Sequence, residues 1–372
     1  MAAPTTTLWE LEPHTRAKHE ILRRYLQAWQ AILTRGGFQE LVYIDGFAGP
    51  GRYSGGEDGS PIIALRNALA LARHQQKMEQ LEYLFFLFVE KDPERARVLQ
   101  QVIDGLERPG WIRVKVAAGK TFEEAFSEFI GFYERKRKRL PPTFAFIDPF
   151  GWKGAPLSIV KKIMSYPSCE VLVNFMYEEI NRFIGHPDQE QNFDSFFGAG
   201  DWRQALAIQV PAERNRFLHD LYAKQLHQAA AVEHVRSFQM KNDRDVTDYY
   251  LFHATNSFKG LQKMKEAMWR VDESGGFTFS DATDPDQLVM FERTPRFDVL
   301  RRQVLAAFAG RQVTVADVEN FVVAKTAFRE THYKSILKDL EEAEPPQLTA
   351  INPAPGRRRG TFPEPSMAIR FT

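Results

Sequence analysis

The stretch Leu41-Val-Tyr-Ile-Asp-Gly-Phe-Ala-Gly-Pro-Gly51 decides the fold expected of this chain. Apolar and aromatic residues lead to one acid, Asp45, and three glycines follow within six positions, Gly46, Gly49 and Gly51. This pattern predicts a buried strand that runs into a glycine-rich loop. Glycines allow positive φ angles in a tight turn, and they let a ligand lie against bare backbone N–H groups. In an open α/β sheet, such ligands bind at the carboxyl ends of the strands.

Two common glycine-loop motifs do not fit this stretch. A nucleotide-triphosphate loop of the Walker type requires a lysine after its last glycine, and the loop after Asp45 has none. Gly119-Lys120-Thr121 imitates the end of that motif, but Val114 stands where its first glycine is required. The dinucleotide motif is met only as Gly49-x-Gly51-x-x-Ser54, and the acid expected about twenty residues later is missing. A nicotinamide or flavin enzyme is therefore a less favoured alternative.

The rest of the first three quarters of the chain alternates strands with helices. Apolar runs predict buried parallel strands at Leu84–Val89, Thr143–Ile147 and Glu170–Phe175, and alternation predicts a more exposed strand at Ile112–Val116. Helical patterns are predicted at Thr15–Leu33, Pro61–Met78, Glu94–Leu106, Thr121–Arg139 and Pro156–Met164. An antiparallel pair, Val235–Met240 and Asp248–Thr255, follows a helical insertion at about 184–232. This order predicts a doubly wound, Rossmann-like sheet with right-handed crossovers.

Polar residues stand at the ends of the predicted strands. Glu90, followed by Lys91, ends the second strand, and a carboxylate suits two ribose hydroxyls because it only accepts hydrogen bonds. Gly119 follows the third strand, near where an adenine ring would lie. The fourth strand delivers Asp148-Pro149-Phe150-Gly151 to the same edge as the glycine loop. The start of the first helix, with His14, Lys18 and His19, either faces this edge or forms a solvated surface.

Five stretches together resemble the three-Cys-motif partner protein family. They are Glu12–Leu22, Val42–Tyr53, Gly59–Pro61, Phe146–Gly151 and Lys265–Arg270, and their order spans roughly the first three quarters of the chain. The resemblance implies the fold of class I S-adenosylmethionine methyltransferases, with S-adenosylmethionine as cofactor, more firmly than it implies a reaction. The three cysteines of the family's name belong to a separate partner protein.

The resemblance also implies roles for the residues at the strand ends. Cofactor contacts are expected from Asp45, Gly46, Phe47, Ala48, Gly49, Gly51, Glu90, Lys91 and Gly119. Asp148, Pro149 and Phe150 are the catalytic candidates, because amino-methyltransferases use an Asp/Asn-Pro-Pro-aromatic tetrad to accept amine hydrogens and stack the base. Gly151 occupies the aromatic position here, so stacking would fall to Phe150 or Trp152. The alternative is a simple Asp-Pro turn at a strand end.

The composition is that of an ordinary two-domain globular protein. Its 49 basic and 48 acidic side chains leave a net charge of +1, so nucleic-acid binding would have to come from local patches. The single cysteine, Cys169, is expected to be a core thiol, and no metal site is predicted. The longest apolar run, Tyr83–Val89, is too short to span a bilayer, and no signal peptide is evident. We expect a cytoplasmic protein.

The sequence changes character after Glu292-Arg-Thr-Pro295, which separates a methyltransferase-type domain, 1–292, from a smaller one, 296–372. Three short helices and a hairpin tipped by Pro355–Gly360 predict a C-terminal winged helix-turn-helix domain. Its candidate nucleic-acid contacts are Arg329, Lys334, Lys338, Arg357, Arg358 and Arg359. The alternative is a winged helix used for protein contact, since nearby glutamates dilute this charge.

A second basic run, Arg135-Lys-Arg-Lys-Arg139, ends the predicted helix after the third strand. It could be a nucleic-acid patch, but cations at a helix C-terminus also interact favourably with the helix dipole, and the latter interpretation is preferred. The leading functional hypothesis is a methyltransferase-like protein acting on an exocyclic amine of DNA or RNA. The rival is a catalytically silent, nucleic-acid-binding partner of the three-cysteine protein.

Overall fold

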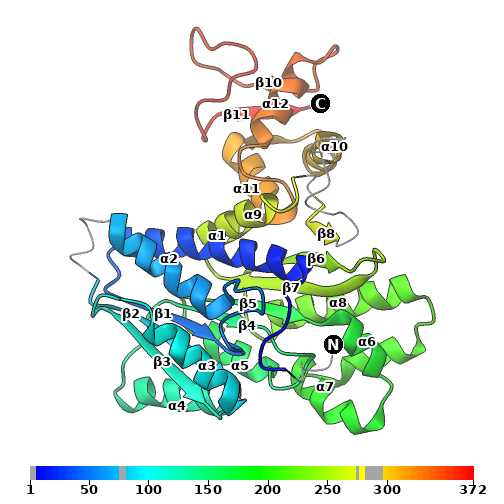
Figure 1. The fold of residues 1–372 in the computed structure, drawn as a ribbon. Helices are drawn as coiled ribbons and strands as arrows, with labels where there is room; N and C mark the ends of the chain where they lie inside the picture. Colours follow the sequence, from blue (N-terminus) through cyan, green and yellow to red (C-terminus); the bar gives the residue numbers. More distant parts are fainter. Residues whose placement is uncertain (1–5, 75–80, 274–275, 281–295) are drawn as a thin grey trace. The chain divides into compact units, whose positions relative to one another are not determined.

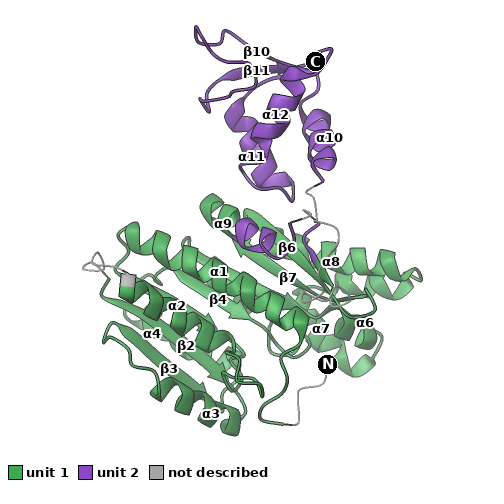
Figure 2. Ribbon diagram, turned by 45° about the horizontal axis from the view of Figure 1, so that its top comes forward, with its two compact units in different colours: residues 1–263, 279–286 green, residues 264–278, 287–372 purple. Residues whose placement is uncertain are grey.

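The computed structural model describes residues 6–74, 81–273, 276–280 and 296–372. The chain forms two compact units, Met1–Lys263 with Phe279–Asp286 and Met264–Thr278 with Gln287–Thr372 (Figure 2). Among the described residues, no helix combines the length and the apolar character needed to cross a membrane.

The first unit is built on a mixed, mainly parallel sheet of eight described strands in the order β3-β2-β1-β4-β5-β7-β6-β8 (Figure 1). The parallel strands are β1 (Glu40–Asp45), β2 (Tyr83–Glu90), β3 (Ile112–Ala118), β4 (Thr143–Ile147) and β5 (Cys169–Phe175). β7 (Thr247–Thr255) runs antiparallel to both β5 and β6 (His234–Lys241), and β8 is Thr278–Ser280. The prediction of an α/β sheet dominated by parallel strands is confirmed.

The strand order reverses next to β1. The chain runs outward from β1 through β2 to β3, and then returns to place β4 on the other side of β1. In register, Asp45 at the end of β1 lies opposite Phe146 of β4. The helices that follow β1 and β4 therefore diverge, which leaves a crevice at the carboxyl ends of these two strands, the usual place for a ligand in an open α/β sheet.

Helices cover both faces of this sheet. The connecting helices are α1 (Pro13–Arg35), α2 (Ser60–His74), α3 (Pro93–Asp104), α4 (Phe122–Arg135) and α5 (Leu157–Met164). Side chains alternate along each strand, so Tyr43 of β1 stacks with Phe144 beneath Tyr25 of α1. Its neighbour Ile44 faces the opposite core, which contains residues of α4 and α5.

The region predicted as a helical insertion is helical. It contains α6 (Tyr177–Phe183), α7 (Glu190–Phe197), α8 (Pro211–Gln228) and two 3-10 helices, Pro187–Gln189 and Gly200–Ala207. Aromatic side chains join it to the sheet, since Phe175 of β5 packs 5.0 Å from Tyr222 and 5.7 Å from Phe196, measured between ring centroids. The aromatic richness of this region therefore reflects a core.

The second unit combines three helices with a small antiparallel sheet. Its elements are α10 (Phe297–Phe308), β9 (Gln312–Thr314), α11 (Val315–Lys325), α12 (Tyr333–Glu342), β10 (Leu348–Ala350) and β11 (Ala368–Phe371). The sheet order is β10-β11-β9, with β11 antiparallel to both neighbours. The last turns of α9 (Phe258–Trp269) belong to this unit as well.

The Lys265–Arg270 stretch has a structural role in the second unit. The Lys265 side chain is 1% exposed, and its ammonium group donates to the carbonyl oxygens of Val322, Val323 and Thr326 at 2.8, 2.9 and 2.9 Å. These carbonyls lie at the end of α11, where backbone acceptors lack helical partners and a cation is favoured by the helix dipole. A single buried lysine thus caps α11.

We predict that Lys265→Met destabilises the second unit by roughly 3 kcal/mol, because hydrogen bonds to charged groups contribute about 1.5–3 kcal/mol each and water can replace some of them. Lys259→Met, an exposed position on the same helix, is the matched control and should change stability by less than about 0.5 kcal/mol. Urea unfolding of the full chain measures both. Equal stability of the two variants would show that the cap contributes nothing.

Candidate functional site

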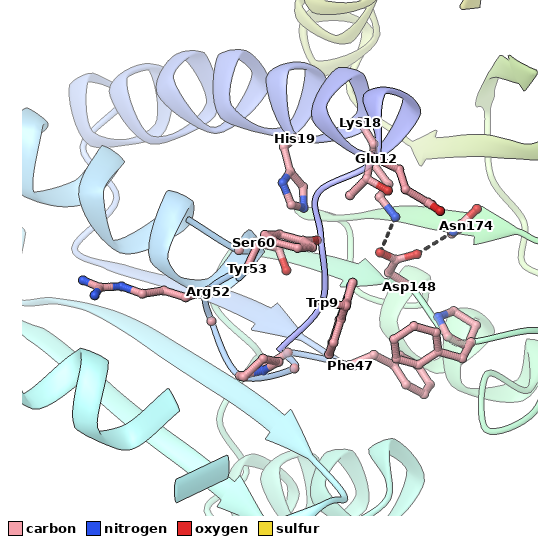
Figure 3. A pocket seen from close by; sticks show the side chains of 18 of the residues that line it. Trp9, Glu12, Lys18, His19, Phe47, Arg52, Tyr53, Ser60, Asp148 and Asn174 are labelled. Carbon is pink, nitrogen blue, oxygen red and sulfur yellow. Dashed lines mark hydrogen bonds and ion pairs between the residues drawn. The ribbon is translucent and has the colours of Figure 1, made fainter. Parts of the chain in front are cut away.

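A cleft of about 330 Å³ opens at the carboxyl ends of β1, β4 and β5 (Figure 3). Its lining combines the loop after β1, the residues after β4, the end of β5, the first turns of α1 and the chain segment before α1. The lining residues from the first three are Phe47–Tyr53, Gly59, Ser60, Asp148, Pro149, Phe150, Asn174 and Met176. The segment before α1 and the first turns of α1 contribute Trp9, Glu10, Glu12, Thr15, Lys18 and His19, and β7 contributes Tyr249.

The glycine loop needs its glycines for backbone geometry and for close packing. Gly49 and Gly51 have φ angles of 62° and 77°, a region that other residues adopt only with strain. A Cβ added at Gly51 would also lie 2.6 Å from Cδ1 of Leu99. After this turn, Arg52 forms an antiparallel β-bridge with Asp58, so residues 52–58 form a short hairpin at the side of the cleft.

Asp45 and Gly46 support this loop from behind and are absent from the described lining of the cleft. The Asp45 carboxylate is completely buried and accepts a hydrogen bond from the backbone N–H of Phe47 at 3.3 Å. Burial raises the pKa of Asp45 to about 7, against the lowering effect of hydrogen bonds from Ser60 and Phe47. Any contribution of Asp45 to a ligand would therefore act through the loop.

Glu90 ties the end of β2 to the same loop. Its two carboxylate oxygens accept hydrogen bonds from the backbone N–H groups of Gly49 at 2.8 Å and Asp92 at 2.7 Å. A carboxylate has about four acceptor positions, so Glu90 keeps the capacity to bind hydroxyl groups. Lys91 is exposed, and Gly119 donates its N–H to the Glu90 carbonyl. All three lie outside the described lining of the cleft.

The residues after β4 enter the cleft as predicted from the strand order, and Asp148 is held there from two sides. The Lys18 ammonium group lies 2.6 Å from one carboxylate oxygen of Asp148, and the Asn174 amide nitrogen donates to the other at 2.5 Å (Figure 3). The side chains of Lys18 and Asp148 are only 8% and 19% exposed. The start of α1 therefore faces the cleft, one of the two arrangements expected for it.

Asn174 was absent from the predicted site. Its signal in the sequence was a polar residue interrupting the apolar run Val171–Phe175 near the end of the strand. The Asn174 side-chain oxygen is buried and has no hydrogen-bond partner among the described residues. Rotating the amide would bring this oxygen against the Asp148 carboxylate, so the orientation follows from electrostatics. Asn174 thus offers an unused acceptor in a cleft where buried acceptors are normally paired.

Aromatic rings line the cleft beside these polar groups. The Trp9 ring lies 5.9 Å from Tyr53 and 5.8 Å from Phe150 in edge-on contacts, and Phe150 is 42% exposed. Trp152 instead packs in the core, 4.8 Å from Phe193. Of the two residues suggested for stacking a base, Phe150 is exposed at the cleft and Trp152 is buried in the core.

His19 points into the cleft from α1 (Figure 3). Burial, and then the charge of Lys18, lowers the pKa of His19 to about 3. The imidazole is therefore neutral at neutral pH, and it lies 5.7 Å from the ring of Tyr53. It can accept or donate a hydrogen bond there without adding charge.

The candidate nucleic-acid residues of the second unit differ in availability. Arg357 forms hydrogen bonds of 2.7 and 2.6 Å with the Glu341 carboxylate, and both side chains are buried. Arg359 donates to the Glu341 carbonyl, while Arg329 lies 3.7 Å from Glu266. Lys334, Lys338 and Arg358 are exposed and form no salt bridge with the described residues. Arg357 is thus neutralised within the unit.

Comparison with solved structures finds distant structural neighbours. No family model and no curated protein matches the chain. A DUF574 family protein from Streptomyces avermitilis has 11% identity and a TM-score of 0.34, and the match covers 66% of this chain and 84% of that one. An O-methyltransferase from Bacillus cereus in complex with SAH has 10% identity and a TM-score of 0.30, with 62% and 80% covered.

A provisionally named methyltransferase from Porphyromonas gingivalis W83 has 11% identity and a TM-score of 0.29. The match covers 61% of this chain but only 39% of that protein's length. At such scores and identities these neighbours carry no functional argument, so function has to be inferred from the cleft itself.

We predict that His19 makes folding acid-sensitive. The unfolded chain binds a proton at His19 below pH 6.5, whereas the folded chain does so only near pH 3, so stability is lost as pH falls from 6.5. This loss amounts to about 1.4 kcal/mol of unfolding free energy per pH unit. The parent should therefore lose roughly 2 to 3 kcal/mol more stability between pH 7 and pH 4.5 than His19→Gln, which has no imidazole to protonate. Urea unfolding at both pH values measures it. An unchanged difference would contradict the buried, neutral imidazole.

Proposed function

We propose that this chain is an S-adenosylmethionine-dependent methyltransferase that acts on an exocyclic amine of nucleic acid, such as that of adenine. The observation that supports it best is the meeting of two elements in one cleft at the reversal of strand order. The glycine loop after β1 and the acceptors Asp148 and Asn174 come from distant parts of the chain, yet they line the same cavity. The glycine loop suits a nucleoside cofactor, and the two acceptors suit an amine.

The residues that line the cleft, and Glu90 behind its glycine loop, suit this cofactor. The bare backbone of Gly49 and Gly51 allows close approach of a ligand, and Glu90, bonded to Gly49, can accept from hydroxyl groups. The rings of Trp9, Phe47 and Tyr53 suit a cation, because the face of an aromatic ring is electronegative. When bound, S-adenosylmethionine supplies an electrophilic methyl group on a sulfonium centre.

The sheet favours this class over a nicotinamide enzyme. A dinucleotide-binding sheet continues past its fifth strand with another parallel strand. Here the antiparallel β7 lies between β5 and β6. Together with the incomplete dinucleotide motif, this order agrees with the resemblance to class I methyltransferases and to the three-Cys-motif partner protein family.

The substrate side of the cleft suits a primary amine. An amine presents two N–H groups, and Asp148 and Asn174 each offer an oxygen acceptor, with the Asp148 carboxylate positioned from α1 by Lys18. Methylation of a neutral amine releases one proton, for which the Asp148 carboxylate is an acceptor within the cleft. The exposed Phe150 ring beside it can stack a base.

The second unit supports a nucleic-acid substrate. We infer that its three helices and antiparallel sheet form a winged helix domain, with the exposed Lys334 and Lys338 on α12 and Arg358 in the connection between β10 and β11 facing phosphates. The alternative is that the same surface binds the separate three-cysteine protein.

One observation favours a catalytically silent partner as the second candidate. Asp148 is engaged by both Lys18 and Asn174, and Phe150 replaces the second proline of the amine-binding tetrad. In that case the cleft retains the cofactor, or only its shape, and the second unit supplies the binding function.

Asp148→Ala separates the two candidates. Because small misplacements of reacting groups are costly, we predict a rate of methyl transfer lower by about a hundredfold or more, with little change in S-adenosylmethionine affinity. The matched control is Glu10→Ala, which removes an exposed carboxylate of the same cleft.

The assay follows a labelled methyl group into total DNA and total RNA from the native host, with the three-cysteine protein present and the cofactor titrated in parallel. Equal background incorporation by the parent and Asp148→Ala proteins, with intact cofactor binding, would support the silent partner instead.

The winged helix proposal predicts a change in salt dependence. Replacing Lys334, Lys338 and Arg358 by Ala should flatten the slope of log affinity against log salt on duplex DNA by up to about 0.9 per lost phosphate contact. Arg357→Ala should leave the slope unchanged and lower stability, because it leaves the buried Glu341 carboxylate without its cationic partner. If the triple variant keeps the parent slope, the unit is assigned to protein contact.

A further inference from the structure

A second cavity of about 430 Å³ lies on the first unit, between α4 and the face formed by β2 and the edge strand β3. It shares no lining residue with the cleft described above. We call it the β3–α4 groove. Its floor is apolar and includes Phe85 of β2 and Phe129 of α4, whose rings stack in parallel with centroids 5.8 Å apart.

An exposed aromatic side chain stands in this groove. Phe132 of α4 is 46% exposed, which is unusual for so large an apolar group inside a cavity. One of its neighbours is Tyr133, with ring centroids 5.4 Å apart in an edge-on contact. The Lys136 ammonium group lies 4.4 Å from the Phe132 centroid.

The groove is also positively charged. Its lining includes Arg113, Lys115, Lys136 and Lys138, all of them exposed and none in a salt bridge with a described residue. The two carboxylates in its lining already have hydrogen-bonding or charged partners. Glu40 accepts a hydrogen bond of 2.5 Å from the Tyr83 hydroxyl, and Glu128 pairs with Lys120.

Neither the helix dipole nor protection of the sheet edge accounts for the whole arrangement. The helix dipole explains cations at the end of α4, such as Lys136, but not Arg113 and Lys115 on a strand. Cations on an edge strand prevent unwanted pairing, which explains Arg113 and Lys115 but not the exposed Phe132. One ligand that is both anionic and aromatic explains all of these groups together.

We propose that the β3–α4 groove binds a single strand of nucleic acid, with a base stacked at Phe132 and phosphates along Arg113, Lys115, Lys136 and Lys138. Stacking platforms flanked by cations are the usual design of sites for single strands. An acidic peptide would use the cations but would have no need of the exposed aromatic ring. The groove is separate from the cleft, so this proposal does not depend on methyl transfer.

The test measures fluorescence anisotropy of labelled oligo(U) and oligo(dT) of about twelve nucleotides, within the usual site size for such proteins. The full chain is compared with Phe132→Ala and with the double variant Lys115→Gln, Lys136→Gln. Leu206→Ala is the apolar control, because Leu206 is also 46% exposed. The double variant Arg216→Gln, Lys224→Gln removes the same charge from exposed positions on α8.

Phe132→Ala should weaken binding about tenfold, as expected for one stacked base. The groove double variant should flatten the log affinity against log salt slope by about 1.4, at about 0.7 per phosphate contact of a single strand. Both controls should match the parent, and thermal unfolding should show that all variants fold. In addition, 5-iodouracil in the oligonucleotide should crosslink within residues 125–138.

The proposal is overturned if the parent binds neither oligonucleotide, or if groove and control variants lose affinity equally. Tighter binding of a poly-glutamate peptide than of either oligonucleotide, with the same sensitivity to Lys115 and Lys136, would assign the groove to an acidic protein partner.

Discussion

The ion pair between Lys18 and Asp148 joins the elements around the cleft. It connects the start of α1 to the end of β4, and Asn174 extends it to the end of β5. A carboxylate with little exposure to water requires charged or hydrogen-bonding partners, and both are supplied here. The N-terminal turns of α1 are therefore fixed against the sheet where the strand order reverses, and the cleft has a rigid polar wall.

The opposite wall is fixed by backbone geometry. Glu90 binds the N–H of Gly49, and Gly51 packs where a Cβ would strike Leu99, so the loop has little freedom to move. A ligand entering between these walls meets bare backbone on one side and oxygen acceptors on the other. That division, with cofactor chemistry and amine chemistry on facing walls, is the physical basis of the proposed methyltransferase function.

Local patterns in the sequence were sufficient to predict the sheet and the wall of the cleft that the glycine loop forms. Apolar runs located β1, β2, β4 and β5, and the cluster of glycines located the loop, because strands and tight turns depend on neighbouring residues. The roles of Lys18 and Asn174 depend on side chains that meet across 130 and 26 positions of sequence, which no local pattern encodes. For the same reason the pairing of Arg357 with Glu341, which lie far apart in the sequence, is not evident from the sequence.

The central claim is that the glycine loop and the Asp148 segment contact one S-adenosylmethionine molecule. Hydrogen exchange of the full chain, followed by mass spectrometry with and without S-adenosylmethionine, tests it directly. The account predicts slower exchange in both peptides that cover residues 46–53 and 148–154, with no change at residues 125–138 of the β3–α4 groove. Unchanged exchange in both cleft segments at saturating S-adenosylmethionine would contradict it.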